Sequence, residues 1–398
     1  MERLLLHNAR VVLEGGVKHG GVLIHDGRIA HIFSDENRPA GMSVNETVDV
    51  RGAYLAPGMI DIHIHGSAGV DVQDAGYRQL TKLSEFLLGQ GVTGYFATFV
   101  PTDERRYEAA CAEVDAYAAH QDEARPDHPR PSCARILGAH FEGPFVSHNK
   151  CGALNREHFR TYDGDARSIE IFTKSSTPRL MTLAPEVEGG LELTGELAAR
   201  GVRPFIGHSQ ADIEMLDAAA ESGARHITHF PNALDPLHHR KPGPVAWGLV
   251  RGDVSLDCIA DFHHTHPMML QLIYQSKGFR RMALISDAIQ PAGLGDGEFS
   301  VWGEPIEVRN GITALARGPA RGTIAGSVIT MHNALRNIVS TGVPIHEAAH
   351  MASLVPARAA GIECDYGSIE LGKRADLFAF DDVLTIQFAI LGGRITQD

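Results

Sequence analysis

The sequence predicts an α/β fold in which a (β/α)8 TIM-like barrel is joined to a small β-sandwich domain built from both chain ends. Three observations support this prediction. Short apolar strands alternate with helical patterns through the middle of the chain, both ends carry alternating β patterns, and several middle strands end in a potential metal ligand. We therefore expect the barrel at residues 57–350 and the discontinuous β-domain at residues 1–56 and 351–398.

The two chain ends are predicted to form strands because apolar residues recur there in short alternating runs. The expected strands are Leu4–Leu13, Gly21–Ile24 and Arg28–Phe33 near the start, and Gly367–Leu371, Ala375–Phe380 and Thr385–Leu391 near the end. An Asp26-Gly27 pair between two of them is typical of a tight hairpin turn. Similar patterns at both ends indicate that they build one domain together.

Helices are predicted between the middle strands, where apolar residues recur every three or four positions. The candidates are Tyr77–Gln90, Tyr107–Ala119, Ala211–Ser222, Pro267–Ser276, Ile329–Thr341 and Ile345–Leu354. Repeated strand-then-helix units favour a parallel sheet, so a doubly wound open sheet is the alternative to a barrel. Ligand-type residues from five strands favour the barrel, because a closed barrel brings all strand ends to one mouth.

The composition restricts the class of partner. The chain has 398 residues, 43% hydrophobic content and a net charge of −13, which argues against nucleic acid or an anionic membrane as the main partner. No apolar stretch approaches the length of a membrane span, and the first apolar run, Leu4–Leu6, is too short for a secretory signal. Five cysteines without a CxxC pair suggest neither a disulfide framework nor a zinc knuckle. We expect a cytoplasmic protein that acts on a small molecule.

The most informative residues are His63 and His65, which end an apolar strand. Side chains at positions i and i+2 of a strand point to the same side, so both imidazoles can face one metal ion. The pair is weak evidence alone, but four further ligand-type residues also follow apolar runs. Glu142 follows Arg135–Phe141, His208 follows Pro204–Gly207, His229 follows His226–Thr228 and Asp287 follows Met282–Ser286. Alone, Glu142 could be a turn or capping carboxylate, and His208 could simply begin the next helix; taken together, the six residues predict a metal site.

Nitrogen and carboxylate ligands without thiolate are typical of hydrolytic sites for one or two divalent ions, with Zn²⁺ expected first and Fe²⁺ or Mn²⁺ as alternatives. Such an ion lowers the pKa of bound water from about 15.7 to near 7, which makes hydroxide available. A carboxylate beside the metal can accept the proton of that water and pass it to a leaving amine. Asp287, the last of the series, is the candidate for this general acid/base.

Several stretches of the sequence resemble the amidohydrolase superfamily and, within it, the N-acetylglucosamine-6-phosphate deacetylases. They are Pro57–Gly66, His140–Phe145, Gly207–Ser209, Thr228–Leu234, Asp261–His264, Ser286–Ala288, Ala325–Ser327 and Gly367–Leu377. The resemblance covers essentially the whole chain. It implies metal-dependent hydrolysis of the acetamide of N-acetyl-D-glucosamine 6-phosphate to D-glucosamine 6-phosphate and acetate.

The resemblance also implies roles for particular residues. Glu142, His208 and His229 would hold one metal ion. His63 and His65 resemble the branch with two ions, in which Glu142 bridges, and some members keep only one. Asp287 matches the catalytic acid/base. The substrate-binding residues would be Asn232, the backbone of Ala233, His264 and Arg240, with Arg240 lent across a homodimer interface to the partner's substrate phosphate.

Leu154 departs from the family pattern, which has a histidine at this position that contacts the acyl carbonyl. Leucine offers no hydrogen bond to a developing oxyanion, and losing such a donor costs about 10²–10³ in rate. A second metal ion could polarise the carbonyl instead, His148 or His158 could substitute, the subfamily could manage without a donor, or the substrate could differ.

Other functions remain open from the sequence. Another N-acyl substrate is the first alternative, either N-acetylgalactosamine 6-phosphate or an N-acyl amino acid. A non-catalytic sugar-phosphate-binding protein is the second. Dihydroorotase- and hydantoinase-like activities are less favoured, because Glu142 occupies the place of their bridging lysine.

Overall fold

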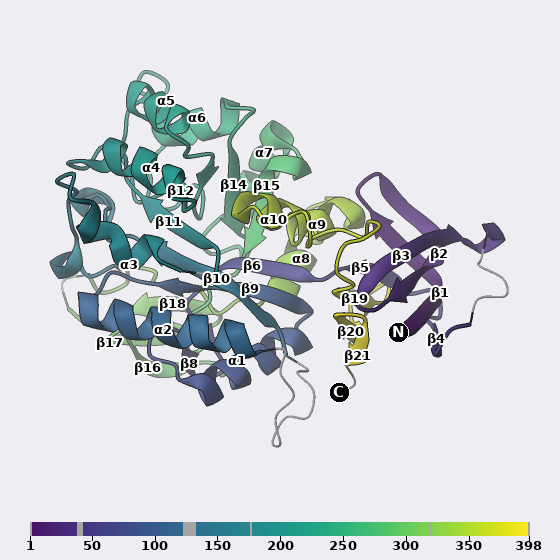
Figure 1. Cartoon of the computed structure of the whole chain (residues 1–398). Coiled ribbons are helices and arrows are strands. Elements are labelled where there is room, and N and C mark those ends of the chain that lie inside the picture. The colour runs from purple at the N-terminus through teal and green to yellow at the C-terminus, as the bar shows by residue number, and fades with distance from the viewer. Residues whose placement is uncertain (1, 38–42, 122–132, 176, 319, 397–398) are drawn as a thin grey trace.

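We describe a computed structural model of the chain, covering residues 2–37, 43–121, 133–175, 177–318 and 320–396. A parallel barrel forms the centre, and a separate sheet lies to one side of it (Figure 1). Among the described residues, no helix is long and apolar enough to cross a membrane.

Both chain ends contribute to one eight-stranded sheet, as the sequence predicts. Its strands are β1 (Arg3–Leu13), β2 (Gly16–His25), β3 (Arg28–Ser34), β4 (Glu46–Asp49), β5 (Tyr54–Pro57), β19 (Leu377–Phe380), β20 (Ile386–Leu391) and β21 (Arg394–Thr396). Strand β5 joins the two ends, because it pairs with β1 on one side and with β19 on the other. The sheet has its own apolar core, which includes Leu6, Leu55 and Leu377.

The predicted strand at Gly367–Leu371 is wrong, because this segment is irregular. Gly367 has a φ of +88°, a left-handed conformation that does not continue a strand. Ile369 is nevertheless buried in the core of the terminal sheet, which explains why the segment has an apolar pattern without pairing as a strand.

Eight parallel strands form the predicted barrel. They are β6 (Met59–Ile64), β9 (Val92–Phe99), β10 (Arg135–Glu142), β11 (Arg179–Leu183), β12 (Arg203–Ile206), β13 (His226–Ile227), β14 (Ser255–Ile259) and β15 (Met282–Ile285), with neighbours in sequence also neighbours in the sheet. The last strand returns to the first, where the His65 N–H donates to the Ala288 carbonyl over 2.8 Å. The strands are almost entirely buried, as expected for a parallel sheet covered by helices.

Helices cover the outside of the barrel. They are α1 (Tyr77–Gly89), α2 (Glu104–His120), α3 (Glu170–Thr173), α4 (Gly190–Ala199), α5 (Ile213–Glu221), α6 (Gly243–Val250), α7 (Pro267–Lys277), α8 (Met331–Ser340), α9 (Ile345–Met351) and α10 (Leu354–Ala360). Each of the six predicted helices overlaps one of these. Helix α10 contacts strands β6 and β15, so residues 354–360 pack with the barrel although they follow the boundary expected at 350. The exact domain division stays a prediction.

Two small antiparallel sheets complete the fold, and neither was predicted from the sequence. One pairs β7 (Gly66–Ser67) with β8 (Val70–Asp71). The other follows the last barrel strand and contains β16 (Gly297–Val301), β17 (Glu304–Arg309) and β18 (Ile312–Leu315). Figure 1 shows β16–β18 and the terminal sheet on opposite sides of the barrel.

Candidate functional site

The six residues predicted as metal ligands converge at the carboxyl ends of five barrel strands. They form two groups, His63 with His65 and Asp287, and Glu142 with His208 and His229. Within each group the ligand atoms lie within 4.8 Å of one another, and all six side chains are buried. This is the end of a (β/α)8 barrel at which active sites are found.

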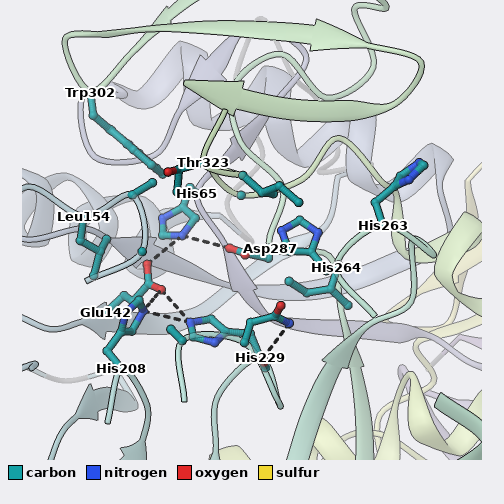
Figure 2. A pocket seen from close by; sticks show the side chains of 17 residues that line it. His65, Glu142, Leu154, His208, His229, His263, His264, Asp287, Trp302 and Thr323 are labelled. Carbon is teal, nitrogen blue, oxygen red and sulfur yellow. Dashed lines mark hydrogen bonds and ion pairs between the residues drawn. The ribbon is translucent and has the colours of Figure 1, made fainter. Parts of the chain in front are cut away.

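Glu142 lies between the two groups (Figure 2). Its Oε1 is 2.9 Å from Nε2 of His208 and 3.0 Å from Nε2 of His229. Its Oε2 faces the other group, 3.2 Å from Nε2 of His65. One oxygen of the carboxylate therefore points at each group, which is the arrangement that a bridging ligand needs.

The imidazole orientations fit a divalent cation. The Nδ1–H of His208 donates to the Lys150 carbonyl over 2.7 Å, and that of His65 donates to the Thr98 carbonyl over 3.1 Å. A histidine held in this way presents the lone pair of Nε2 to a metal. Converging Nε2 atoms and carboxylate oxygens are thus a donor set suited to a divalent ion such as zinc.

Three of the ligand-type residues have a left-handed backbone. The φ angles are +49° at His208, +34° at His229 and +49° at Asp287. This region is sparsely populated by residues with a Cβ atom and costs of order 1–3 kcal/mol at each position. Such conformations are concentrated at functional sites, because the surrounding structure must hold them. At the ends of three barrel strands, the strain aims the side chains into the mouth.

Two buried aspartates support the ligands. Asp257 accepts a hydrogen bond from the backbone N–H of His229, and its other oxygen lies 2.8 Å from Nε2 of His226. Asp61 accepts hydrogen bonds from the Ser286 hydroxyl over 2.5 Å and from the His63 N–H over 3.3 Å. Burial raises the pKa of Asp61 to about 6, although these hydrogen bonds oppose the shift. Neither aspartate was predicted from the sequence, although Asp61 lies two residues before His63 and therefore on the same face of the strand.

The site is electrostatically coupled. Burial disfavours ionisation of Glu142, but the imidazoles of His63, His208 and His229 outweigh it and hold its pKa well below the usual range. Asp287 is likewise buried, and His63 and His65 lower the pKa of its carboxyl. Conversely, the carboxylate of Glu142 overcomes burial and raises the pKa of His229 to about 9. Without a metal ion, protons on His65 and His229 offset the charge of the carboxylates, since both of these imidazoles have raised pKa values.

A pocket of about 340 Å³ opens onto the ligand cluster. Its lining includes Asn232, Ala233 and His264, three of the four residues predicted to bind substrate. The fourth, Arg240, is not among the lining residues and is exposed in the loop before α6, where its backbone N–H donates to Nδ1 of His238 over 3.3 Å. One copy of the described chain therefore does not bring Arg240 to its own pocket.

Most of the remaining pocket wall was not predicted from the sequence. Trp302 comes from the turn between β16 and β17, Thr323 and Ile324 follow β18, and His263 precedes His264. Leu154 lines the pocket directly (Figure 2). Of the two histidines considered as substitutes for a donor at this position, neither His148 nor His158 is among the lining residues. No local sequence signal marks the contribution of β16–β18.

The fold and the site together define a metal-dependent hydrolase, and comparison with known proteins specifies the family. The Amidohydrolase family model matches residues 205–395. An N-acetylglucosamine-6-phosphate deacetylase of Bacillus subtilis (strain 168) is 33% identical over 401 residues, which cover 99% of this chain and 97% of the relative. An N-acetylgalactosamine-6-phosphate deacetylase of Escherichia coli O157:H7 is 35% identical, with 96% of each chain covered.

Solved structures agree with this relationship. The crystal structure of N-acetylglucosamine-6-phosphate deacetylase from Thermotoga maritima has a TM-score of 0.85 and 31% identity, covering 98% of this chain and 99% of that one. A mutant of the Mycobacterium smegmatis enzyme in complex with N-acetyl-D-glucosamine-6-phosphate has a TM-score of 0.87 and 26% identity, with 99% of each chain covered. The chain therefore belongs to the N-acetylglucosamine-6-phosphate deacetylase family of the amidohydrolase superfamily.

Proposed function

We propose that this protein hydrolyses the acetamide of N-acetyl-D-glucosamine 6-phosphate, giving D-glucosamine 6-phosphate and acetate. The observation that carries the proposal is the position of Glu142 between two groups of ligand-type residues at the floor of the pocket, in a chain that belongs to this family. Amide hydrolysis near neutral pH needs an activated water, a polarised carbonyl and a proton donor for the leaving nitrogen.

The two groups of ligand-type residues are the proposed binding sites for the divalent ions. Glu142, His208 and His229 would hold one divalent ion, and His63, His65 and Asp287 would hold a second, with Glu142 shared. Zn²⁺ is the first candidate and Fe²⁺ or Mn²⁺ are the alternatives, because all three accept imidazole and carboxylate ligands. A divalent ion bound here supplies Lewis acidity for the carbonyl and lowers the pKa of water.

Asp287 is proposed as the general acid/base. Its carboxylate lines the pocket at the end of β15 and is held ionised by His63 and His65, so it can accept a proton from the attacking water. It can then pass that proton to the nitrogen of the leaving amine, which departs neutral. Burial of the site excludes bulk water and strengthens these electrostatic interactions.

The phosphate end of the substrate is assigned to Asn232, the backbone of Ala233 and His264, with Arg240 from the partner of a homodimer. Ala233 has a φ of +54°, so the chain turns sharply where its backbone faces the pocket. Arg240 is suited to a phosphate because a guanidinium donates two parallel hydrogen bonds to it. A charged sugar phosphate is retained inside a cell, and we propose that the enzyme works in the cytoplasm.

The hexosamine epimer is the main alternative, because relatives of similar identity carry the glucosamine and the galactosamine names. The deciding experiment measures acetate release from N-acetylglucosamine 6-phosphate, its galactosamine epimer and both unphosphorylated sugars. Enzyme reconstituted with Zn²⁺, Fe²⁺ or Mn²⁺ is used, and metal content is determined on the same samples. Preferential turnover of the glucosamine phosphate supports the proposal. Binding without turnover by fully metallated enzyme would instead favour a non-catalytic sugar-phosphate-binding protein.

A further inference from the structure

The two ends of the pocket differ in chemistry. Figure 2 shows His264 on one side of the ligand cluster, and Leu154 and Trp302 on the other. The first end contains polar groups suited to a phosphate and a sugar. The second is mainly apolar, with Ala153 in the wall and Thr323 beside Trp302 as its polar member (Figure 2). The chain thus presents a hydrocarbon surface directly beside the residues that would act on the amide.

Trp302 reaches this wall through a strained turn. Val301 pairs with Glu304, so Trp302 and Gly303 form a two-residue hairpin turn with φ angles of +54° and +84°. This turn type favours Asn, Asp or Gly, and tryptophan is an unusual occupant. Its ring packs edge-on against the His65 ring, with centroids 5.0 Å apart. The strained backbone of Trp302 therefore places an indole ring against a candidate metal ligand. Backbone strain of this kind is concentrated at functional sites.

A second, smaller cavity of about 60 Å³ lies beyond the apolar wall. It shares Ala153, Leu154 and Trp302 with the main pocket, so these three side chains line both spaces. Its own wall includes apolar residues such as Val100 and Ile306, together with polar ones such as Glu304. Leu154 is 8% exposed and packs in an apolar cluster with Val100 and Val146.

The orientation of the substrate follows from the two ends. The carbonyl carbon must lie over the ligand cluster and within reach of Asp287. If the sugar phosphate extends toward Asn232 and His264, the acyl substituent on the other side of the amide must extend toward Leu154 and Trp302. Leucine cannot hydrogen-bond this group, but its hydrocarbon surface suits an alkyl chain, whereas a polar acyl group there would lose its hydration.

We propose that Ala153, Leu154 and Trp302 form the binding surface for the N-acyl group, and that Leu154 limits the length of the acyl chain by closing the way to the smaller cavity. This inference rests on the proposed function, because it takes the amide of an N-acyl hexosamine phosphate as the reacting bond. It assigns specificity, rather than a contact with the carbonyl oxygen, to the position where the family has a histidine.

The test compares N-acetyl, N-propionyl and N-butyryl glucosamine 6-phosphate as substrates of metal-loaded enzyme. Leu154→Ala joins the two cavities, and we expect it to raise the ratio of kcat/KM for N-butyryl over N-acetyl by about tenfold or more, since each methylene in an apolar pocket is worth about 10–200-fold. Leu154→Val removes less volume, is the milder change for folding, and should give an intermediate ratio. Val146→Ala is the control, because Val146 packs with Leu154 but lines neither cavity.

Binding gives a second readout that does not depend on turnover. In an Asp287→Asn background, the ratio of dissociation constants for the N-butyryl and N-acetyl compounds should shift in the same direction when Leu154 becomes Ala. Unchanged ratios in both Leu154 variants, or an equal shift in Val146→Ala, would overturn the inference while N-acetyl turnover by the wild type still supports the proposed function. A metal-loaded wild type that turns over none of the three would overturn the proposed function, and the binding ratios would then decide the inference separately.

Discussion

The backbone N–H of Asp287 donates to the carbonyl oxygen of His63 over 2.9 Å, while the Asp287 Oδ1 lies 3.3 Å from the His63 Nε2. The first contact joins the last strand of the barrel to the first. The second joins the candidate acid/base to a candidate metal ligand. Closure of the barrel and assembly of the site are therefore the same structural event, made by residues 224 positions apart in the chain (287 − 63). A site of this kind forms only when the whole barrel has closed.

Replacement of Asp287 by Asn keeps the size of the side chain and its backbone contact but removes the proton acceptor. We expect kcat to fall by about 10²–10⁴, the usual contribution of general acid–base catalysis. Metal bound through Glu142, His208 and His229 should be retained, which element analysis of the purified variant measures. Asp296→Asn is the control, because Asp296 accepts from the Asn310 N–H over 2.9 Å and does not line the pocket. A kcat within a few-fold of wild type for Asp287→Asn would remove it from this role.

Strand ends and ligand-type residues could be predicted from the sequence because their signals are local. The spacing of His63 and His65 follows from strand alternation, and residues that end parallel strands of a barrel must meet at one mouth. The identity of the supporting residue Asp257 could not be predicted. Its partners, the His229 N–H and His226, are about 30 residues away, and only the fold brings them into contact.

The contribution of β16–β18 to the pocket wall could not be predicted from the sequence, for a different reason. These strands carry several exposed charged residues and have a small core of their own, so nothing local distinguishes them from a surface loop after the barrel's last strand. Whether Trp302 covers the site depends on how the hairpin folds back over it. The role that the family implies for Arg240 could not be tested on a single chain, because it needs a second copy of the chain.

Removal of the Asp257 carboxylate should destabilise the protein. Asp257 is fully buried, and Asp257→Ala would leave the His229 N–H and the His226 imidazole without their acceptor. Leaving a buried donor without its acceptor costs about 1–3 kcal/mol of unfolding free energy for each group, which urea denaturation of the metal-free protein measures. Loss of a supporting residue also lowers metal affinity about 10–100-fold, measured by competition with a chelator. Asp257→Asn keeps one acceptor oxygen and should be intermediate; a wild-type stability for Asp257→Ala would contradict the argument.

Metal binding should release protons. In the metal-free protein, burial is outweighed by Asp287 and Glu142, which raise the pKa of His65 to about 10, and Glu142 raises that of His229 to about 9. Both imidazoles are protonated in the folded state at pH 7.5 but mostly neutral in the unfolded chain, where the histidine pKa is about 6.5. This raised pKa stabilises the metal-free protein fully below about pH 6.5, and the contribution is lost as the pH rises through 9 to 10.

A divalent ion must displace these protons, so its affinity should rise from pH 6.5 to about 9. Calorimetry of zinc binding at pH 7.5 in two buffers with different ionisation enthalpies should show net proton release. The melting temperature of the metal-free protein should fall over pH 7 to 10, whereas that of the metal-loaded protein should change less. Zinc binding without proton release at pH 7.5 would contradict the protonation of His65 and His229.

Replacement of Arg240 tests both the recognition of the substrate phosphate and the proposed homodimer. If it binds the phosphate of a substrate in the partner subunit, Arg240→Ala should raise KM for the 6-phosphate about 10–100-fold, since a hydrogen bond to a charged group is worth about 1.5–3 kcal/mol. Turnover of the unphosphorylated sugar should not change. Lys241→Ala is the matched control, because Lys241 is the next residue in the same exposed loop. Light scattering after size-exclusion chromatography should give a dimer for all three proteins.

Mixed dimers decide whether Arg240 acts across the interface. When Arg240→Ala and Asp287→Asn subunits are unfolded, mixed and refolded together, a hybrid dimer contains one site with an intact Asp287 and the partner's Arg240. Random pairing makes half of the dimers hybrids with one complete site each, so activity at low substrate should recover to about a quarter of wild type from two nearly inactive parents. If each Arg240 instead served its own subunit, no site in a hybrid would be complete. Activity would then remain at the level of the parent variants.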